Sequence, residues 1–80
     1  MKSYPNPFIS TTTLEFELEH AGNVRISIVN QFGVIIYENV LAGQKGKNLK
    51  AWDPGTLPAG VYVCRILSGN QIATGKIVKQ

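Results

Sequence analysis

The feature that most constrains this chain is an alternation of apolar and polar side chains with a period of two. In residues 14–18, the apolar Leu14, Phe16 and Leu18 are separated by glutamates, and residues 24–28 and 62–66 repeat the pattern. A strand points successive side chains to opposite faces, whereas a helix needs apolar residues three and four positions apart. No ten-residue segment carries such a helical stripe. The alternation therefore predicts an all-β fold.

Turn signals rich in glycine, proline and asparagine divide the alternating segments about every ten residues. We expect strands in 11–19, 24–30, 34–40, 48–52, 61–67 and 72–79, with a loop at 41–47 and a long irregular connection at 53–60. The turns are expected at HAGN, QFG and SGNQ. Six or seven short strands at this spacing predict an immunoglobulin-like antiparallel β-sandwich. A partly open barrel is the alternative architecture. The side chains expected to face the core from the second and fifth of these segments are Val24, Ile26, Ile28, Tyr62, Cys64 and Ile66.

Length and composition are those of one small globular domain. The chain has 80 residues, of which 44% are hydrophobic and 16% charged, and this balance is unlike that of a disordered segment. No apolar run approaches the roughly 20 residues of a membrane-spanning helix. MKSYPNPF lacks the apolar centre of a signal peptide. We therefore expect residues 1–80 to be a single domain excised from a larger protein, and any export signal to belong to another part of that protein.

The segment YPNPF near the start is built from two prolines and two aromatic residues. Pro5 and Pro7 lack backbone donors and exclude a helix here. Each proline also favours an extended conformation in the residue before it. The expected structure is a stiff, extended edge segment with an apolar ring at each end, Tyr4 and Phe8. Asn6 can supply the hydrogen bonds that the prolines cannot.

The residue types of an active site are nearly absent. The only thiol and the only imidazole belong to Cys64 and His20, and Cys64 falls on the inward face of a predicted strand, where cysteine acts as a small hydrophobe. Glu15, Glu17 and Glu19 form a straight row, which cannot converge on a calcium ion. We expect this row to pair with Arg25 or a lysine, or to be solvated. The sequence predicts no catalytic residue, no metal site and no cofactor.

Positive charge is concentrated in the second half of the chain. Residues 1–40 carry two basic and four acidic side chains, and residues 41–80 carry six and one. Such a surface could steer an anionic partner, although a solvated exterior is the more common reason for it. Lys45, Lys47 and Lys50 near Trp52 could suggest a nucleic-acid surface. Trp52 is instead expected in the core or at its rim, and we expect no nucleic-acid partner.

The order of the motifs resembles one known family. YPNPF, the strand TTLEFEL, VRISIVNQFG, a tryptophan, LPAGVYVCRI and the closing GKIVK occur in the order seen in type IX secretion system C-terminal sorting domains (type A) of Bacteroidetes. The resemblance covers residues Tyr4 to Lys79. The sequence departs from the family pattern at Asn30, where aspartate is common, and at Cys64, where a larger aromatic side chain is frequent.

The resemblance implies a non-enzymatic, monomeric sorting signal. Domains of this family are recognised by the outer-membrane type IX translocon, and a sortase-like signal peptidase usually cuts in the linker before them. The parent protein, after transit through the periplasm, is then released or attached to anionic lipopolysaccharide at the cell surface. The rival functions are an adhesion or carbohydrate-binding β-sandwich and a structural spacer of a surface protein.

The resemblance also points to two groups of recognition residues. One is the N-terminal motif, made of Tyr4, Pro5, Asn6, Pro7 and Phe8. The other lies near the C-terminus and comprises Gly60, Tyr62, Gly69, Gly75, Lys76, Ile77, Val78 and Lys79. Purely structural roles are the alternative for the glycines and the tyrosine, since strand starts and hairpins need such residues. Lys76 and Lys79 are three apart on a strand, so at least one of them should be exposed.

Overall fold

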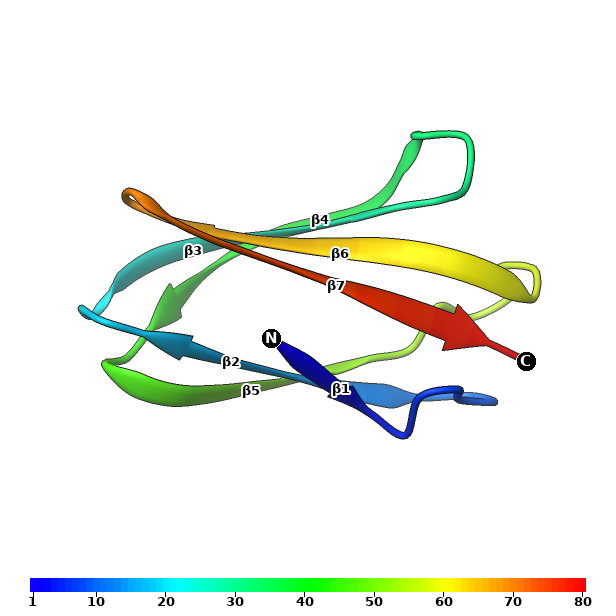
Figure 1. Ribbon diagram of the computed structural model, residues 1–80, viewed down its shortest axis with the longest axis horizontal. Helices are drawn as coiled ribbons and strands as arrows, with labels where there is room; N and C mark the ends of the chain where they lie inside the picture. The colour runs from blue at the N-terminus through cyan, green and yellow to red at the C-terminus, as the bar shows by residue number, and fades with distance from the viewer.

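The alternating segments form seven strands in the computed structural model, which describes residues 1–80. The sheets have the strand orders β1-β2-β5 and β4-β3-β6-β7 and lie face to face as two layers (Figure 1). The predicted all-β sandwich of about seven strands is confirmed, and the barrel alternative is wrong, because the two sheets remain separate. The strands are β1 (Lys2–Tyr4), β2 (Thr12–Leu18), β3 (Gly22–Val29), β4 (Ile35–Gly43), β5 (Gly46–Trp52), β6 (Gly60–Ser68) and β7 (Gln71–Lys79).

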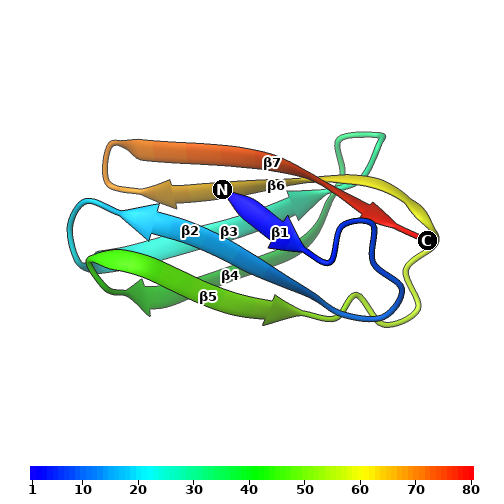
Figure 2. The same cartoon turned by 60° about the horizontal axis from the view of Figure 1, so that its bottom comes forward.

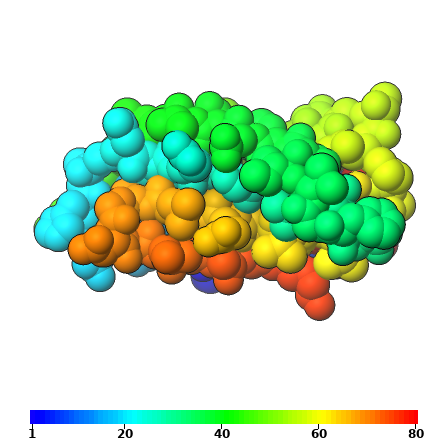
Figure 3. Space-filling model, turned by 90° about the horizontal axis from the view of Figure 1, so that it is seen from above, coloured from blue at the N-terminus to red at the C-terminus, as the bar shows by residue number.

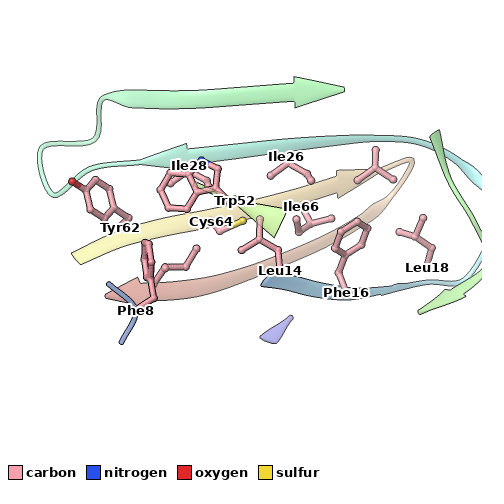
Figure 4. Packing of buried hydrophobic residues seen from close by; sticks show 12 residues of the cluster. Phe8, Leu14, Phe16, Leu18, Ile26, Ile28, Trp52, Tyr62, Cys64 and Ile66 are labelled. Carbon is pink, nitrogen blue, oxygen red and sulfur yellow. The ribbon is translucent and has the colours of Figure 1, made fainter. Parts of the chain in front are cut away.

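The core lies between the two layers and is made of the side chains that the alternation places inward. Every neighbouring strand pair in the sheets is antiparallel, so each strand buries one face and exposes the other. Figure 4 shows how side chains from both layers meet. The buried cluster comprises Phe8, Leu14, Phe16, Leu18, Val24, Ile26, Ile28, Trp52, Tyr62, Cys64, Ile66 and Ile77. The inward residues predicted for residues 14–18, 24–28 and 62–66 are all confirmed. None of the elements is a helix long and apolar enough to cross a membrane.

The connection between β4 and β5 differs from the prediction. Residues 41–47 were expected to form a loop, but β4 continues to Gly43 and β5 begins at Gly46, so that only Gln44 and Lys45 lie between them. The side chain of Asn48 stabilises this turn, because its Oδ1 accepts from the Gln44 N–H at 3.0 Å and its Nδ2 donates to the Gln44 carbonyl at 2.8 Å. Gly43 and Gly46 therefore flank a two-residue turn that connects one sheet to the other.

The turn between β3 and β4 follows the prediction. The Oδ1 atom of Asn30 accepts hydrogen bonds from the N–H groups of Phe32 and Val34 at 2.9 and 3.1 Å. Gly33 has a φ of 79°, in the left-handed region that favours glycine. Asparagine thus provides the acceptor for two backbone donors of this turn.

The first glutamate of the predicted row, Glu15, pairs with side chains of the neighbouring strands β1 and β5. Lys47 Nζ lies 4.0 Å from Glu15 Oε1, and Tyr4 donates its hydroxyl hydrogen to the same carboxylate oxygen at 2.9 Å. The expectation of pairing with a lysine is confirmed for Glu15. The hydrogen bond to this carboxylate raises the pKa of the Tyr4 hydroxyl, with smaller contributions from desolvation and from the negative charge of Glu15.

Candidate recognition surface

The N-terminal motif lies along the outer edge of the C-terminal strand. The N–H of Phe8 donates to the Val78 carbonyl at 2.9 Å, and the Gln80 N–H donates to the Phe8 carbonyl at 2.8 Å. These two bonds form an isolated parallel bridge between Phe8 and Lys79. Figure 2 shows the segment after β1 curving toward the C-terminus. The start of the chain therefore extends the four-stranded sheet at its last strand.

Asn6 completes this edge with its side chain. Its Oδ1 accepts from the Val78 N–H at 2.9 Å, and its Nδ2 donates to the Lys76 carbonyl at 2.9 Å. The flanking prolines have no N–H to offer, so the amide of Asn6 provides both a donor and an acceptor in place of a backbone. The expectation that Asn6 supplies hydrogen bonds is confirmed. An edge strand leaves a row of unpaired backbone groups, and from Lys76 to Gln80 the motif occupies that row.

Two details of the motif differ from the prediction. The segment bends at residues 5–7 instead of running straight, and both X-Pro peptide bonds are cis. The bend carries Asn6 and Phe8 from the three-stranded sheet, where β1 belongs, to β7 in the other sheet. The two aromatic rings at the ends of the motif have different surroundings. Phe8 is 1% exposed, whereas Tyr4 is 44% exposed, because it lies on the outer face of β1 with its hydroxyl on Glu15.

A buried threonine anchors the bend and was not singled out in the sequence. Thr12, 1% exposed, donates its hydroxyl hydrogen to the Pro5 carbonyl at 2.9 Å. A buried hydroxyl needs such a partner. The only sequence signal was that Thr12 shares the inward parity of Leu14 and Phe16.

Four aromatic rings pack at the end of the sandwich where the motif docks. The Trp52 ring centroid lies 5.9 Å from that of Phe8, 6.0 Å from that of Tyr37 and 6.2 Å from that of Tyr62. Figure 4 shows Phe8, Trp52 and Tyr62 converging from three parts of the chain. The Tyr62 hydroxyl donates to the Pro58 carbonyl and so holds the connection between β5 and β6. The prediction that Trp52 lies in the core or at its rim is confirmed, since its side chain is buried.

Most of the C-terminal recognition residues lie in the same region. In the pairing of β6 with β7, Gly60 is opposite Lys79, Tyr62 is opposite Ile77, and Lys76 is opposite Val63. Tyr62 and Ile77 are buried, at 4% and 0% exposure. Lys76 is exposed, while Val78 and Lys79 are half-buried. The expectation that at least one of the two lysines is exposed is confirmed for Lys76.

The glycines of this group sit at different places. Gly60 has a φ of 154° at the start of β6, and Gly69 has a φ of 57° in the β6–β7 hairpin, so both positions disfavour side chains. Gly75 lies on the inner face beside Cys64, where an added Cβ would be 3.1 Å from the Met1 side chain. Gly69 lies at the far end of the β6–β7 hairpin from the N-terminal motif. The structure thus brings together most of the proposed recognition residues, whereas Gly69 lies apart and the Tyr4 side chain binds Glu15 of the three-stranded sheet.

The residues that were considered for catalysis or metal binding are not clustered in the structure. Cys64 is fully buried, and desolvation raises the pKa of its thiol to about 12. His20 is in the exposed turn between β2 and β3, so the two residues form no pair. No group of three or more His, Cys, Asp or Glu side chains is placed to hold a metal ion. The largest hollow, about 620 Å³, is formed by two polar turns at the other end of the sandwich.

Gln71 is a further residue that sequence reasoning missed. Its Nε2 donates to the Glu17 carbonyl at 2.7 Å, and its Oε1 accepts from the Glu19 N–H at 3.1 Å. These bonds join the first residue of β7 to the edge of β2 beyond the end of β1. The C-terminal strand is therefore tied to the opposite sheet at both of its ends.

Comparison with known proteins identifies one family model. It is described as the secretion system C-terminal sorting domain, and it matches residues 2–80. Comparisons with curated proteins and with solved structures gave no match.

Proposed function

The chain belongs to the family of secretion system C-terminal sorting domains, which are sorting signals of type IX secretion, and we propose that the machinery recognises the end of the sandwich where the two termini meet. This recognition surface consists of the docked motif, residues 4–8, and the end of β7, residues 76–80. As a sorting domain, the chain interacts with the type IX machinery and directs export to the cell surface or the medium.

One observation supports this surface above all others: residues 70 positions apart in the sequence make one continuous edge. Asn6 and Phe8 bind the backbone of residues 76–80 through four hydrogen bonds. The same edge exposes Lys76. A partner that bound here would contact both family motifs at once, and it would meet them only in a folded domain.

The individual steps of export that we propose are those that the family resemblance implies. We propose that the outer-membrane type IX translocon binds the folded domain from the periplasmic side. A sortase-like signal peptidase acts on the parent protein, which is released or joined to anionic lipopolysaccharide. The domain itself acts as a monomer, is not an enzyme and needs no cofactor. Residues 1–80 serve as one sorting domain. The only cysteine, Cys64, has a structural role, which its burial supports.

The test compares export of a periplasm-targeted reporter fused before residue 1 in a type IX-competent host. The Lys76→Ala, Lys79→Ala double variant should fold like the unaltered domain, since a solvated lysine usually changes stability by less than about 0.5 kcal/mol. Its export should nevertheless fall. The control is the Lys45→Ala, Lys47→Ala double variant. It changes the net charge by the same amount at positions outside the recognition surface.

Deletion of residues 76–80 should lower export further, because it also removes Ile77 and the backbone groups that Asn6 and Phe8 bind. Melting temperatures of the purified domains separate recognition from folding. Export that survives the five-residue deletion would refute the C-terminal signal. Export that falls only in step with the melting temperature would show that the machinery reads no particular surface.

A further inference from the structure

A group of exposed apolar residues lies beside the recognition surface on the outer face of the four-stranded sheet. We call it the apolar patch, and it consists of Phe32, Val34, Ile35, Val61 and Val63. Their exposed fractions range from 79% for Phe32 to 38% for Val63. Single exposed apolar residues are ordinary on a protein surface, but contiguous groups mark interaction sites.

Strand register shows why these residues form one surface. Ile35 of β4 is opposite Val29 of β3, Val29 is opposite Val63 of β6, and Val63 is opposite Lys76 of β7. Residues directly opposite each other share a face of the sheet, so this row crosses all four strands. Figure 3 looks onto this face, where the β3–β4 turn lies beside the beginning of β6. Phe32 and Val34 belong to that turn, and Val61 is two residues before Val63.

A pocket opens at the edge of the apolar patch. It has a volume of about 100 Å³ and lies between the β3–β4 turn and the start of β6. Six of its ten lining residues are hydrophobic, and Phe32, Leu57 and Tyr62 are among them. A closed apolar cavity of ~150 Å³ accepts benzene, so this pocket is the right size for one aliphatic side chain.

Two cations without acidic partners adjoin the patch on the same face. Lys76 is in the row of Val63, and Arg65 is two residues farther along β6. The only ion pair within 4.0 Å in the molecule joins Lys47 and Glu15 on the other sheet. The one acid of this face, Glu38, accepts a hydrogen bond from Ser27 at 3.2 Å. Arg65 and Lys76 are therefore free to pair with carboxylates that a partner brings.

We propose that the apolar patch binds a protein of the type IX machinery that presents one projecting apolar side chain flanked by carboxylates. The partner's apolar side chain enters the pocket, and the partner residues around it cover Ile35 and Val63. The partner's carboxylates form ion pairs with Arg65 and Lys76. This inference rests on the proposed function and extends the recognition surface beyond Lys76. A second copy of the domain would bring the same cations to the contact and repel it. A lipid bilayer would favour apolar residues gathered at one projecting tip, whereas only Phe32 and Val34 lie in the β3–β4 turn and Val61 and Val63 lie on β6.

The test uses two matched triple variants of the reporter fusion. The patch variant is Phe32→Ser, Ile35→Thr, Val63→Thr. The control variant is Ile9→Ser, Leu49→Thr, Ile72→Thr, whose residues are also highly exposed, at 73%, 60% and 63%, and lie outside the patch. The patch variant should reduce export about ten-fold or more, as expected when interface anchors are lost. The control should stay within about two-fold, because exposed positions contribute little to stability.

A photo-crosslinker at position 32 provides a direct readout of contact. It should form an adduct with a component of the type IX machinery in the export-competent host, and the same group at position 72 should not. A separate measurement tests binding of the purified domain to vesicles of phosphatidylglycerol and phosphatidylethanolamine. Sedimentation equilibrium of the same samples reports self-association.

The outcomes separate this inference from the proposed function. If the unaltered domain exports its reporter and the patch variant exports it equally well, the inference is overturned and the proposed function stands. If the reporter fused to the unaltered domain is not exported in the competent host, the proposed function is wrong. The inference, which rests on it, is then wrong as well. Normal export of a patch variant that has lost vesicle binding or dimer formation would assign the patch to a membrane or to a second copy, and would overturn the inference too.

Discussion

Two aromatic residues of the same short motif have opposite surroundings. Phe8 is buried against Trp52, with ring centroids 5.9 Å apart, while Tyr4 faces solvent and donates a hydrogen bond to Glu15. Hydrophobicity alone ranks the two rings alike. What separates them is the bend at residues 5–7, which turns one ring into the core and leaves the other outside.

This contrast predicts unequal costs of truncation. Phe8→Ala should reduce the free energy of unfolding by about 3–5 kcal/mol, the usual range for a fully buried phenylalanine. Tyr4→Ala should cost less than about 1 kcal/mol, because an exposed hydrogen bond contributes little net free energy. Urea midpoints measure both. Equal shifts for the two variants would contradict the placement of Phe8 in the core.

Cys64 gives the molecule a pH dependence. Burial raises the pKa of its thiol from 9.0 to about 12, so the unfolded chain loses this proton at lower pH than the folded domain does. The contribution is fully present below about pH 9 and is lost as the pH rises toward 12. Unfolding free energies measured from pH 8 to pH 11 should therefore fall less steeply for Cys64→Val than for the unaltered domain. Identical slopes would show that the thiol is not desolvated. All other residues are the same in both proteins, so their contributions cancel in the comparison.

At the scale of strands, close packing of β4 against β2 and β3 depends on a glycine at the end of β4. An added Cβ at Gly43 would lie 2.5 Å from Leu18 Cδ1 and 2.7 Å from Val24 Cγ2, both of them buried side chains. Its direct cross-strand partner, Gly22, has nothing within 4 Å of such an atom. The two glycines look equivalent in the sequence, where both fall in turn-like segments.

Substituting each glycine in turn tests this close contact. Gly43→Ala should destabilise the domain by about 1–3 kcal/mol through overpacking. Gly22→Ala should change stability by less than about 0.5 kcal/mol. Melting temperatures of the two variants provide the comparison, and a neutral Gly43→Ala would mean that Leu18 and Val24 can move aside.

Local sequence patterns predicted which segments form strands better than they predicted which residues those strands lie beside. The alternation of Leu14, Phe16 and Leu18 fixes which face is buried, since parity along a strand is a local property. The two-layer architecture followed from the number and spacing of such segments. The end of β4 was misjudged because Gly43, needed for packing, reads like a turn residue. Parity predicted that at least one of Lys76 and Lys79 is exposed, but the place of Lys76 beside Val63 depends on the pairing of β6 with β7.

At the scale of the whole molecule, the central feature is the joining of the two ends of the chain. The sequence indicated that Asn6 must bond to something, but its partners on β7 lie 70 and 72 residues away, beyond the reach of any local pattern. Thr12 and Gln71 were missed for the same reason, as each side chain binds a distant backbone. The family resemblance singled out both ends separately, and the fold explains why they belong together.

The most direct measurement of this joining is amide hydrogen exchange along β7 in the unaltered domain. The N–H groups of Val78 and Gln80 are bonded to Asn6 and Phe8. Those of Ile72 and Thr74 point to the same outer edge by alternation, but no strand pairs with that edge. We expect slow exchange at Val78 and Gln80 and fast exchange at Ile72 and Thr74, since local protection follows hydrogen bonding. Exchange at Val78 and Gln80 as fast as at Ile72 and Thr74 would contradict the docking of the N-terminal motif on the C-terminal strand.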